Sequence, residues 1–186
     1  MATIPHVDRD ALAREIASVA LLRGTFTLRS GRTSSYYLDK YLFSTRPEVL
    51  SKLAALFHER LHMLRSAGIR IDRIAGAELG GIPLVTAAAL QSGLPTVLVR
   101  NKKKDYGTSK QVEGAVNKGD SIVLLEDVAT TGGQALEAVQ TLRELGAEVP
   151  CVIATIDRLE GARETIEGAG VRFEALFTKR DLGVTE

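Results

Sequence analysis

The stretch Ser121-Ile-Val-Leu-Leu-Glu-Asp-Val-Ala-Thr-Thr-Gly-Gly-Gln134 joins an apolar run to two carboxylates and then to a loop rich in hydroxyls and glycines. Its first part, Ile122–Leu125, is apolar without alternation, which is typical of a central strand covered on both faces. The residues after Gly133 follow a helical pattern. A buried strand, a loop and a helix in this order predict an α/β protein with a parallel sheet, whose ligands bind at the carboxyl ends of the strands.

The same alternation of elements continues from about residue 70 to the end of the chain. Runs of β-branched residues predict strands over Arg70–Ala75, Thr96–Arg100, Ser121–Glu126, Val149–Asp157 and Val171–Phe177. Helical patterns between the strands predict helices over Ile82–Gln91, Gly133–Leu145 and Gly161–Ala169. We therefore expect residues 46–186 to form one α/β core, a parallel sheet flanked by helices.

The first 45 residues follow a different pattern and predict a small N-terminal portion packed on the core. An amphipathic helix over residues 11–20 is preceded by Asp8 as a cap, and we expect Gly24 to close it. Two short strand-like pieces around a Ser-Gly turn make up Phe26–Asp39. Thr45-Arg-Pro-Glu48 then predicts a capping box, with Pro47 near the first helical position, that opens a long helix to about Ser66.

Composition excludes several classes of protein. The 186 residues hold 24 basic and 23 acidic side chains, so a net charge of +1 gives no reason to expect nucleic-acid binding. No apolar run is long enough to span a bilayer, and the start lacks the apolar stretch of a signal peptide. Cys151 is the single cysteine, which excludes an intrachain disulfide. We expect a cytoplasmic protein with no membrane partner.

The loop after the central strand has the chemistry of a receptor for a sugar phosphate. Gly132 and Gly133 allow backbone amides to approach a ligand, and these amides, the helix N-terminus and the hydroxyls of Thr130 and Thr131 suit a phosphate. Glu126 and Asp127 would repel a phosphate but can accept hydrogen bonds from the diol of a ribose. A P-loop nucleotidase is a poor match, because the Gly-Lys-Ser/Thr ending is missing. The alternative is a purely structural turn with an acidic strand end.

Leu124-Leu-Glu-Asp-Val-Ala-Thr-Thr-Gly-Gly133 resembles the phosphoribosyl diphosphate (PRPP) signature of type I phosphoribosyltransferases. With Phe26-Thr-Leu-Arg-Ser-Gly31, Gly80-Gly-Ile-Pro83 and Asp157-Arg158, the whole chain is similar to the orotate phosphoribosyltransferase family. The resemblance implies a type I fold with an N-terminal hood that recognises the base, and transfer of ribose 5-phosphate from PRPP to orotate in pyrimidine nucleotide synthesis. Two alternatives stay open: a type I transferase for a purine or uracil, and a non-catalytic regulator that senses PRPP.

The resemblance also implies which residues bind the donor. They are Arg100, Asn101, Lys104, Tyr106, Glu126, Asp127, Val128, Ala129, Thr130, Thr131, Gly132, Gly133 and Gln134, and the catalytic ones among them are Lys104, Tyr106, Glu126 and Asp127. Mg²⁺ would be held mainly by the substrate rather than directly by protein ligands, because oxygen ligands and retained waters suit that ion.

The basic run Arg100-Asn-Lys-Lys-Lys-Asp-Tyr-Gly107 places four cations in five positions. Such cations can stabilise the charge that grows on a departing diphosphate, most strongly when a closing loop excludes water. The resemblance implies a homodimer in which this loop reaches the neighbouring active site. Lys102 or Lys103 could share the role of Lys104. Many relatives carry Lys at the position of Asn101 and His at that of Tyr106, and some carry Lys at that of Gly80.

A base pocket for orotate needs a cation with a fixed fork, because the ring bears a carboxylate. Arg158, just beyond a predicted strand, suits that carboxylate by bidentate geometry. The resemblance adds Thr130 against the base and Arg29 where many relatives carry Lys, and the ring could be lined by Tyr37 together with its neighbour Tyr36. The alternative for Arg158 is a surface arginine paired with Asp157 or Glu160.

His58-Glu-Arg-Leu-His62 matches the pattern of a zinc protease. We interpret the match as a coincidence, because a catalytic zinc also needs a third ligand and His6 is the only other histidine. The buried stripe of this helix is predicted to be Leu50, Leu53, Phe57, Leu61 and Leu64.

Overall fold

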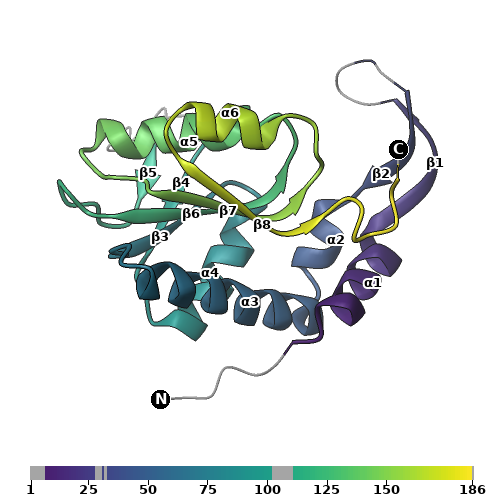
Figure 1. Ribbon diagram of the computed structural model, residues 1–186, viewed down its shortest axis with the longest axis horizontal. Helices are drawn as coiled ribbons and strands as arrows, with labels where there is room; N and C mark the ends of the chain where they lie inside the picture. Colours follow the sequence, from purple (N-terminus) through teal and green to yellow (C-terminus); the bar gives the residue numbers. More distant parts are fainter. Residues whose placement is uncertain (1–6, 28–30, 32, 102–110, 186) are drawn as a thin grey trace.

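The computed structural model describes residues 7–27, 31, 33–101 and 111–185. Its centre is a six-stranded sheet in the order β5-β4-β3-β6-β7-β8, parallel except for the short edge strand β5 (Figure 1). The strands are β3 (Arg73–Ala77), β4 (Thr96–Val99), β5 (Val112–Glu113), β6 (Ile122–Ala129), β7 (Cys151–Asp157) and β8 (Arg172–Thr178). This confirms the α/β fold and the five predicted core strands, with ends that differ by a few residues.

Helices cover both faces of this sheet, as a parallel sheet requires. One face carries α3 (Pro47–Ser66) and α4 (Gly81–Ser92), and the other carries α5 (Gly133–Glu144) and α6 (Ala162–Gly168) (Figure 1). Two hydrophobic clusters result, one on each face. Strand β6 lies between them, with every residue from Ile122 to Asp127 buried, which confirms that it is a central strand.

The N-terminal elements stand beside one end of the sheet (Figure 1). They are α1 (Arg9–Ala20), the antiparallel pair β1 (Leu21–Thr27) and β2 (Thr33–Leu38), and the short helix α2 (Lys40–Ser44). Asp8 caps α1, accepting a hydrogen bond from the amide of Ala11 at 3.0 Å, as predicted. Leu12 and Ile16 are buried in the cluster that also contains residues of α3, which fixes this portion against the core.

Two sequence predictions about the N-terminal portion are wrong. Gly24 does not close a helix: α1 ends at Ala20, and Gly24 lies inside β1, where the pairing with β2 shifts register as in a β-bulge. Thr45 does not form a capping box with Glu48, because its hydroxyl donates to the carbonyl of Tyr41 at 2.6 Å and so closes α2. Helix α3 starts instead from Arg46 with no side-chain cap, and Pro47 takes the first helical position as predicted.

Helix α3 carries the buried stripe that the sequence predicts, except that Leu50 is only half-buried. His58 is half-buried and His62 exposed on this helix. In the described part of the chain, no three His, Cys, Asp or Glu side chains are grouped so that they could hold a metal ion. Nor does any helix there have the length and apolar character that a bilayer crossing requires.

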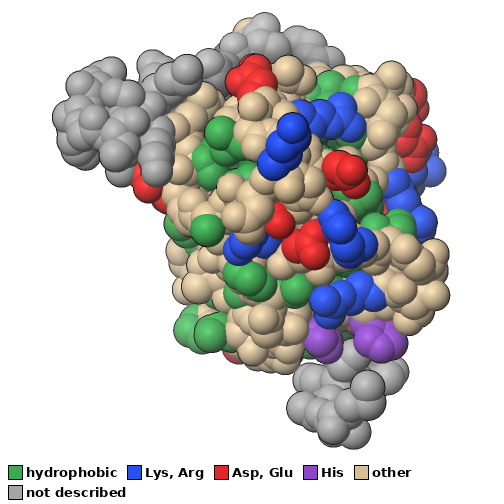
Figure 2. All heavy atoms as spheres, turned by 90° about the vertical axis from the view of Figure 1, so that its left-hand side faces the viewer, with side chains coloured by type: hydrophobic (Ala, Val, Ile, Leu, Met, Phe, Trp, Pro, Cys, Tyr) green, Lys and Arg blue, Asp and Glu red, His purple; other side chains and the backbone are tan. Residues whose placement is uncertain are grey.

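The side of the molecule away from the N-terminal elements is charged but mixed. At the amino ends of β3 and β6, Arg73 pairs with Asp120 at 2.7 Å and Arg70 with Asp72 at 3.1 Å. Figure 2 shows this side, where basic and acidic side chains are interspersed. Neither sign forms a patch among the described residues visible there.

The core should depend strongly on Phe57, a fully buried residue of α3. We expect Phe57→Ala to lower the free energy of unfolding by about 3–5 kcal/mol, because it removes a large apolar side chain and leaves a cavity. Urea unfolding followed by circular dichroism measures this. Met63→Ala is the matched control on the same helix: its side chain is 52% exposed, so the loss should stay within about 0.5 kcal/mol. Equal losses in the two variants would contradict this account of the core.

Candidate active site

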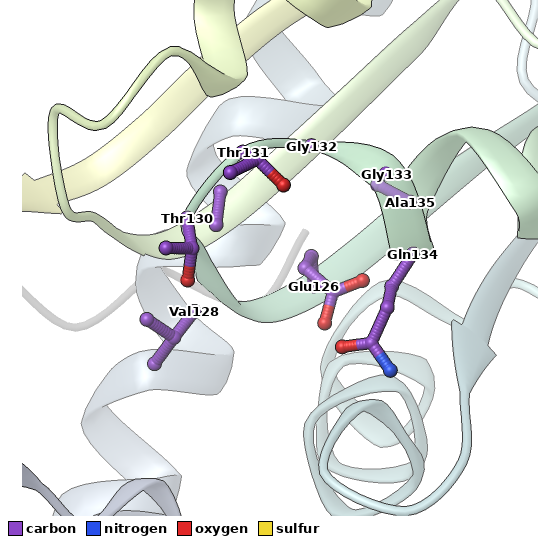
Figure 3. Close-up of a pocket in the computed structure, with 9 residues that line it drawn as sticks. Glu126, Val128, Thr130, Thr131, Gly132, Gly133, Gln134 and Ala135 are labelled. Carbon is purple, nitrogen blue, oxygen red and sulfur yellow. The ribbon is translucent and has the colours of Figure 1, made fainter. Parts of the chain in front are cut away.

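A pocket lies at the carboxyl end of β6, where the strand turns into α5. It is lined by Glu126 and by the run from Val128 to Ala135. Figure 3 shows the carboxylate of Glu126 in the hollow, with Thr130 and Thr131 on one side and Gln134 on the other. The structure thus brings together most of the predicted donor-binding residues.

The turn into α5 depends on Gly132. This residue caps the helix with φ of 85°, a left-handed conformation that favours glycine. A side chain here would also meet the carbonyl oxygen of Ala162 and Cγ1 of Ile166, both at 3.1 Å, so the loop packs tightly on α6. Gly133 is less constrained, since a Cβ on it would have only the Thr131 hydroxyl nearby at 3.8 Å. No side chain caps α5, and Gly133, Gln134 and Ala135 of its first turn line the pocket, so the amides at this helix start are left for a ligand.

The two adjacent acids at the end of β6 have different surroundings. Glu126 is 8% exposed, and its Oε1 accepts the amide of Asp127 at 3.1 Å while its Oε2 has no hydrogen-bond partner. Asp127 is 1% exposed and accepts the amide of Val128 at 2.6 Å through Oδ1. Its Oδ2 lies 2.9 Å from Nζ of Lys40, on α2. Asp127 is not among the pocket-lining residues and faces the N-terminal portion instead.

Burial and repulsion by the neighbouring carboxylate raise the pKa of Glu126. Burial raises the pKa of Glu126 well above its usual 4.5, and the negative charge of Asp127 raises it further, while Lys40 lowers it. Burial works to lower the pKa of Lys40, but the Asp127 carboxylate outweighs it, and the pKa of Lys40 is raised above 10.5. Lys40 therefore remains a cation at neutral pH, next to two buried carboxyl groups.

The turn from β3 to α4 packs against the carboxylate of Asp127. A Cβ on Gly80 would lie 1.5 Å from Oδ2 of Asp127, so only glycine leaves room for that carboxylate. This turn also holds the base of the basic loop, because Oε1 of Glu78 accepts the amide of Asn101 at 2.8 Å. Arg100 is half-buried, and its backbone pairs with that of Gln111. Lys104 and Tyr106, together with Lys102 and Lys103, lie outside the described residues.

Arg158 sits at the end of β7, beside the loop that follows β6. Its amide donates to the carbonyl of Ala129 at 2.9 Å, which places Thr130 and Arg158 on neighbouring strand ends. The Arg158 side chain is 15% exposed, and its Nη2 lies 2.9 Å from Oε1 of Glu160. The ion pair that the alternative interpretation expected is therefore present, but it is largely buried rather than on the surface.

A tyrosine from the N-terminal portion reaches Arg158, but it is Tyr36 rather than Tyr37. Nη2 of Arg158 donates to the hydroxyl of Tyr36 at 3.2 Å, and the guanidinium lies 5.3 Å from the centre of the Tyr36 ring. Tyr37 is 45% exposed and packs on Phe26, with ring centres 5.7 Å apart. Successive side chains of a strand point to opposite faces, so only one of the two tyrosines can meet Arg158. Arg29 lies outside the described residues.

Lys40 is the site residue that the sequence analysis missed. The sequence Tyr36-Tyr-Leu-Asp-Lys-Tyr-Leu-Phe43 carries no motif that marks it, and α2 itself was not predicted. One local signal was available: Asp39 caps α2, accepting the amide of Tyr41 at 3.1 Å, and an aspartate before a short apolar run is a helix-start signal.

Three comparisons with known proteins bear on this arrangement. A family model described as "Phosphoribosyl transferase domain" matches residues 45–174. The orotate phosphoribosyltransferase of Haloquadratum walsbyi is 42% identical over 186 residues, covering 99% of this chain and 98% of that protein. That of Pyrococcus furiosus is 43% identical over 159 residues, 86% of each chain. A crystal structure of Mycobacterium tuberculosis orotate phosphoribosyltransferase in complex with PRPP superimposes with a TM-score of 0.77 at 30% identity, covering 96% of this chain and all of that one.

The buried Glu126 should make the protein less stable as the pH rises. The folded state holds the Glu126 proton more tightly than the unfolded chain, so stability falls as the pH rises above about 4.5. We expect Glu126→Gln to be more stable than the wild type at pH 7, because the difference grows by up to about 1.4 kcal/mol for each pH unit above about 4.5 until the folded-state pKa is passed. The gain should shrink towards pH 4.

Urea unfolding at a series of pH values measures this difference. Glu137→Gln, an exposed acid on α5, is the control and should show no such pH-dependent gain. If Glu126→Gln were no more stable than the wild type at pH 7, the buried carboxyl would not carry the strain inferred here.

Proposed function

The chain belongs to the phosphoribosyl transferase family and has orotate phosphoribosyltransferase activity, and we propose that the pocket at the end of β6 is where it binds PRPP. In this reaction a ring nitrogen of orotate forms a bond to the anomeric carbon of the sugar as the bond to diphosphate breaks, giving orotidine 5′-monophosphate for pyrimidine nucleotide synthesis. The observation that carries the proposal is the acid pair Glu126 and Asp127 near the end of β6, followed after the loop Thr130–Gly132 by the N-terminus of α5, which has no side-chain cap.

The two ends of the pocket suit the two ends of the sugar. The amides of Gly133 and Gln134, at the positive end of α5, and the hydroxyls of Thr130 and Thr131 bind the 5-phosphate. Val128, Ala129 and Gly132 shape the loop around it. The carboxyl oxygens of Glu126, in the pocket, accept hydrogen bonds from the ribose hydroxyls, and we assign a second acceptor to the adjacent Asp127 once the sugar is bound. The negative charge of the two acids stabilises the positive charge that develops at the anomeric carbon.

Arg158 binds the carboxylate of orotate. It is held by Tyr36 and Glu160, and its Nε is buried without a hydrogen-bond partner, so the guanidinium keeps donor capacity for a planar anion. We assign the contact with the ring to Tyr36 in place of Tyr37, and we retain Thr130 and Arg29 in the base site. In this proposal residues 1–45 are the base-recognition portion and residues 46–186 the α/β core.

The departing diphosphate needs positive charge. Arg100 and Asn101 lie at the base of the loop that carries Lys104 and Tyr106, and we propose that this loop neutralises the diphosphate in the active site of a second subunit of a homodimer. Oε2 of Glu126, which has no hydrogen-bond partner, fits an oxygen-coordinated ion held through substrate hydroxyls and water. Mg²⁺, when bound, would neutralise charge on the diphosphate.

We also propose that the enzyme works in the cytoplasm. Its single cysteine, Cys151, is fully buried, and burial raises its pKa to about 12, so it stays a thiol. A chain without disulfides is compatible with a reducing compartment.

An absorbance assay of orotate consumption tests the activity. With PRPP and Mg²⁺ we expect orotate to be consumed and diphosphate released in equal amounts, whereas adenine, hypoxanthine and uracil in place of orotate should give no comparable rate. Preferred turnover of one of these bases, or no turnover of any, would overturn the assignment.

Replacing Arg158 should separate the two substrates. We expect Arg158→Ala to lower kcat/KM for orotate about 10- to 100-fold, since a hydrogen bond to a charged group contributes about 1.5–3 kcal/mol, with little change in the KM for PRPP. Steady-state kinetics with each substrate varied in turn measures this. Arg172→Ala, which removes an exposed arginine paired with Glu174 on β8, should leave both values unchanged. If Arg158→Ala raised only the KM for PRPP and left the kinetics with orotate unchanged, Arg158 would not bind the base.

A further inference from the structure

An ion pair beside the proposed sugar site joins two parts of the chain that are distant in sequence. Lys40 is the first residue of α2 and Asp127 lies near the end of β6, and Nζ and Oδ2 are 2.9 Å apart. The Lys40 side chain is 32% exposed and that of Asp127 only 1%. Because the Asp127 carboxylate is buried, this pair is screened less than a pair between two fully exposed side chains.

The residues packed around the Asp127 carboxylate restrict which groups can bind its two oxygens. Its Oδ1 accepts the amide of Val128, and Gly80 packs so close to Oδ2 that no side chain could be added there. Lys40 is thus the cation that meets the second oxygen. Each carboxylate oxygen has two lone pairs, so both oxygens keep acceptor capacity while their directions are fixed.

We propose that Lys40 is a positioning residue for PRPP binding: its ammonium fixes the Asp127 carboxylate so that the ribose hydroxyls meet acceptors in set directions. The inference rests on the proposed function, in which the diol binds at the acid pair. Lys40 acts through Asp127 and needs no contact with the substrate. The free-energy cost of partly burying the Lys40 ammonium is offset by its electrostatic attraction to the Asp127 carboxylate.

Lys40 also affects Glu126. Within the described part of the chain, the charged and titratable groups that act on this pair are Asp127, Glu126 and Lys40 itself, with Tyr41 beside Lys40. The positive charge of Lys40 lowers the pKa of Glu126, against the effects of burial and of Asp127. Without Lys40, Glu126 keeps its proton to a higher pH, and a protonated carboxyl group loses the negative charge that the reacting sugar requires.

The first experiment is steady-state kinetics of Lys40→Met, Lys40→Arg and Lys52→Met. We expect Lys40→Met to raise the KM for PRPP about tenfold or more, the scale at which groups in direct contact are coupled, while the KM for orotate changes little. Lys40→Arg keeps the charge and should recover most of the loss. Lys52 forms a similar pair with Glu15 at 2.5 Å between α1 and α3, so Lys52→Met controls for losing a lysine ion pair outside the site.

The pH profile separates positioning from a structural role. In Lys40→Met the acid limb of kcat/KM for PRPP should move to higher pH, in Lys40→Arg it should stay near the wild-type position, and in Lys52→Met it should not move. A Lys40→Met enzyme with the wild-type KM for PRPP and an unmoved acid limb overturns the proposal.

A double variant keeps the test valid if Lys40→Met alone does not fold. In Asp127→Asn the partner of Lys40 has lost its charge, so removing Lys40 as well should no longer matter. We expect Asp127→Asn and Lys40→Met/Asp127→Asn to bind PRPP with Mg²⁺ within about twofold of each other by calorimetry at a pH above the acid limb of both variants, where Glu126 is ionised in each. A further large loss in the double variant would mean that Lys40 contacts the ligand directly, and would overturn the positioning role.

The outcomes also distinguish this inference from the proposed function. If Asp127→Asn and Glu126→Gln bind PRPP as tightly as the wild type, the proposed sugar site is wrong. If they lose affinity while Lys40→Met does not, the site stands and only the role of Lys40 is wrong.

Discussion

Burying two adjacent carboxyl groups at the end of the central strand is the constraint on which the site depends. Isolated buried charges are costly, so they need partners or must give up their charge. Glu126 and Asp127 are stabilised by the backbone amides that follow each of them and by the ammonium of Lys40. Even so, the pKa of Glu126 is raised by burial and by its neighbour. In the function proposed above, this buried acid pair supplies negative charge and fixed acceptors beside the sugar, which would explain why its cost is retained.

The parallel sheet explains why so many segments meet at this point. In a parallel sheet all strands deliver their following loops to one edge. The turn after β3 therefore brings Gly80 against Asp127, and the loop after β6 and the end of β7 bring Thr130 and Arg158 to neighbouring positions. The strands are parallel and paired in register, and this alone brings these loops close together at the same edge of the sheet.

The N-terminal portion completes the site from the side. Tyr36 on β2 and Lys40 on α2 come from one short stretch of chain, yet they reach two different parts of the core, Arg158 and Asp127. The same stretch therefore links the proposed base site to the proposed sugar site. A displacement of β2 and α2 would disturb both contacts at once, which gives this small portion an influence on both substrates.

The sequence by itself determined the core architecture and the chemistry of the donor loop. These features are local patterns: the apolar run before Glu126, the glycines after Thr131 and the alternation of strands and helices. A strand buried on both faces consists mainly of apolar residues, so it can be recognised from residue type alone. The helix starts at Asp8 and Pro47 were readable for the same reason. Only the tertiary structure decided that Lys40 meets Asp127, that Tyr36 rather than Tyr37 meets Arg158, and that Gly24 lies in a bulge. These outcomes depend on contacts between residues far apart in the chain, or on which face a strand turns to the core, and neither is encoded in a short window of sequence.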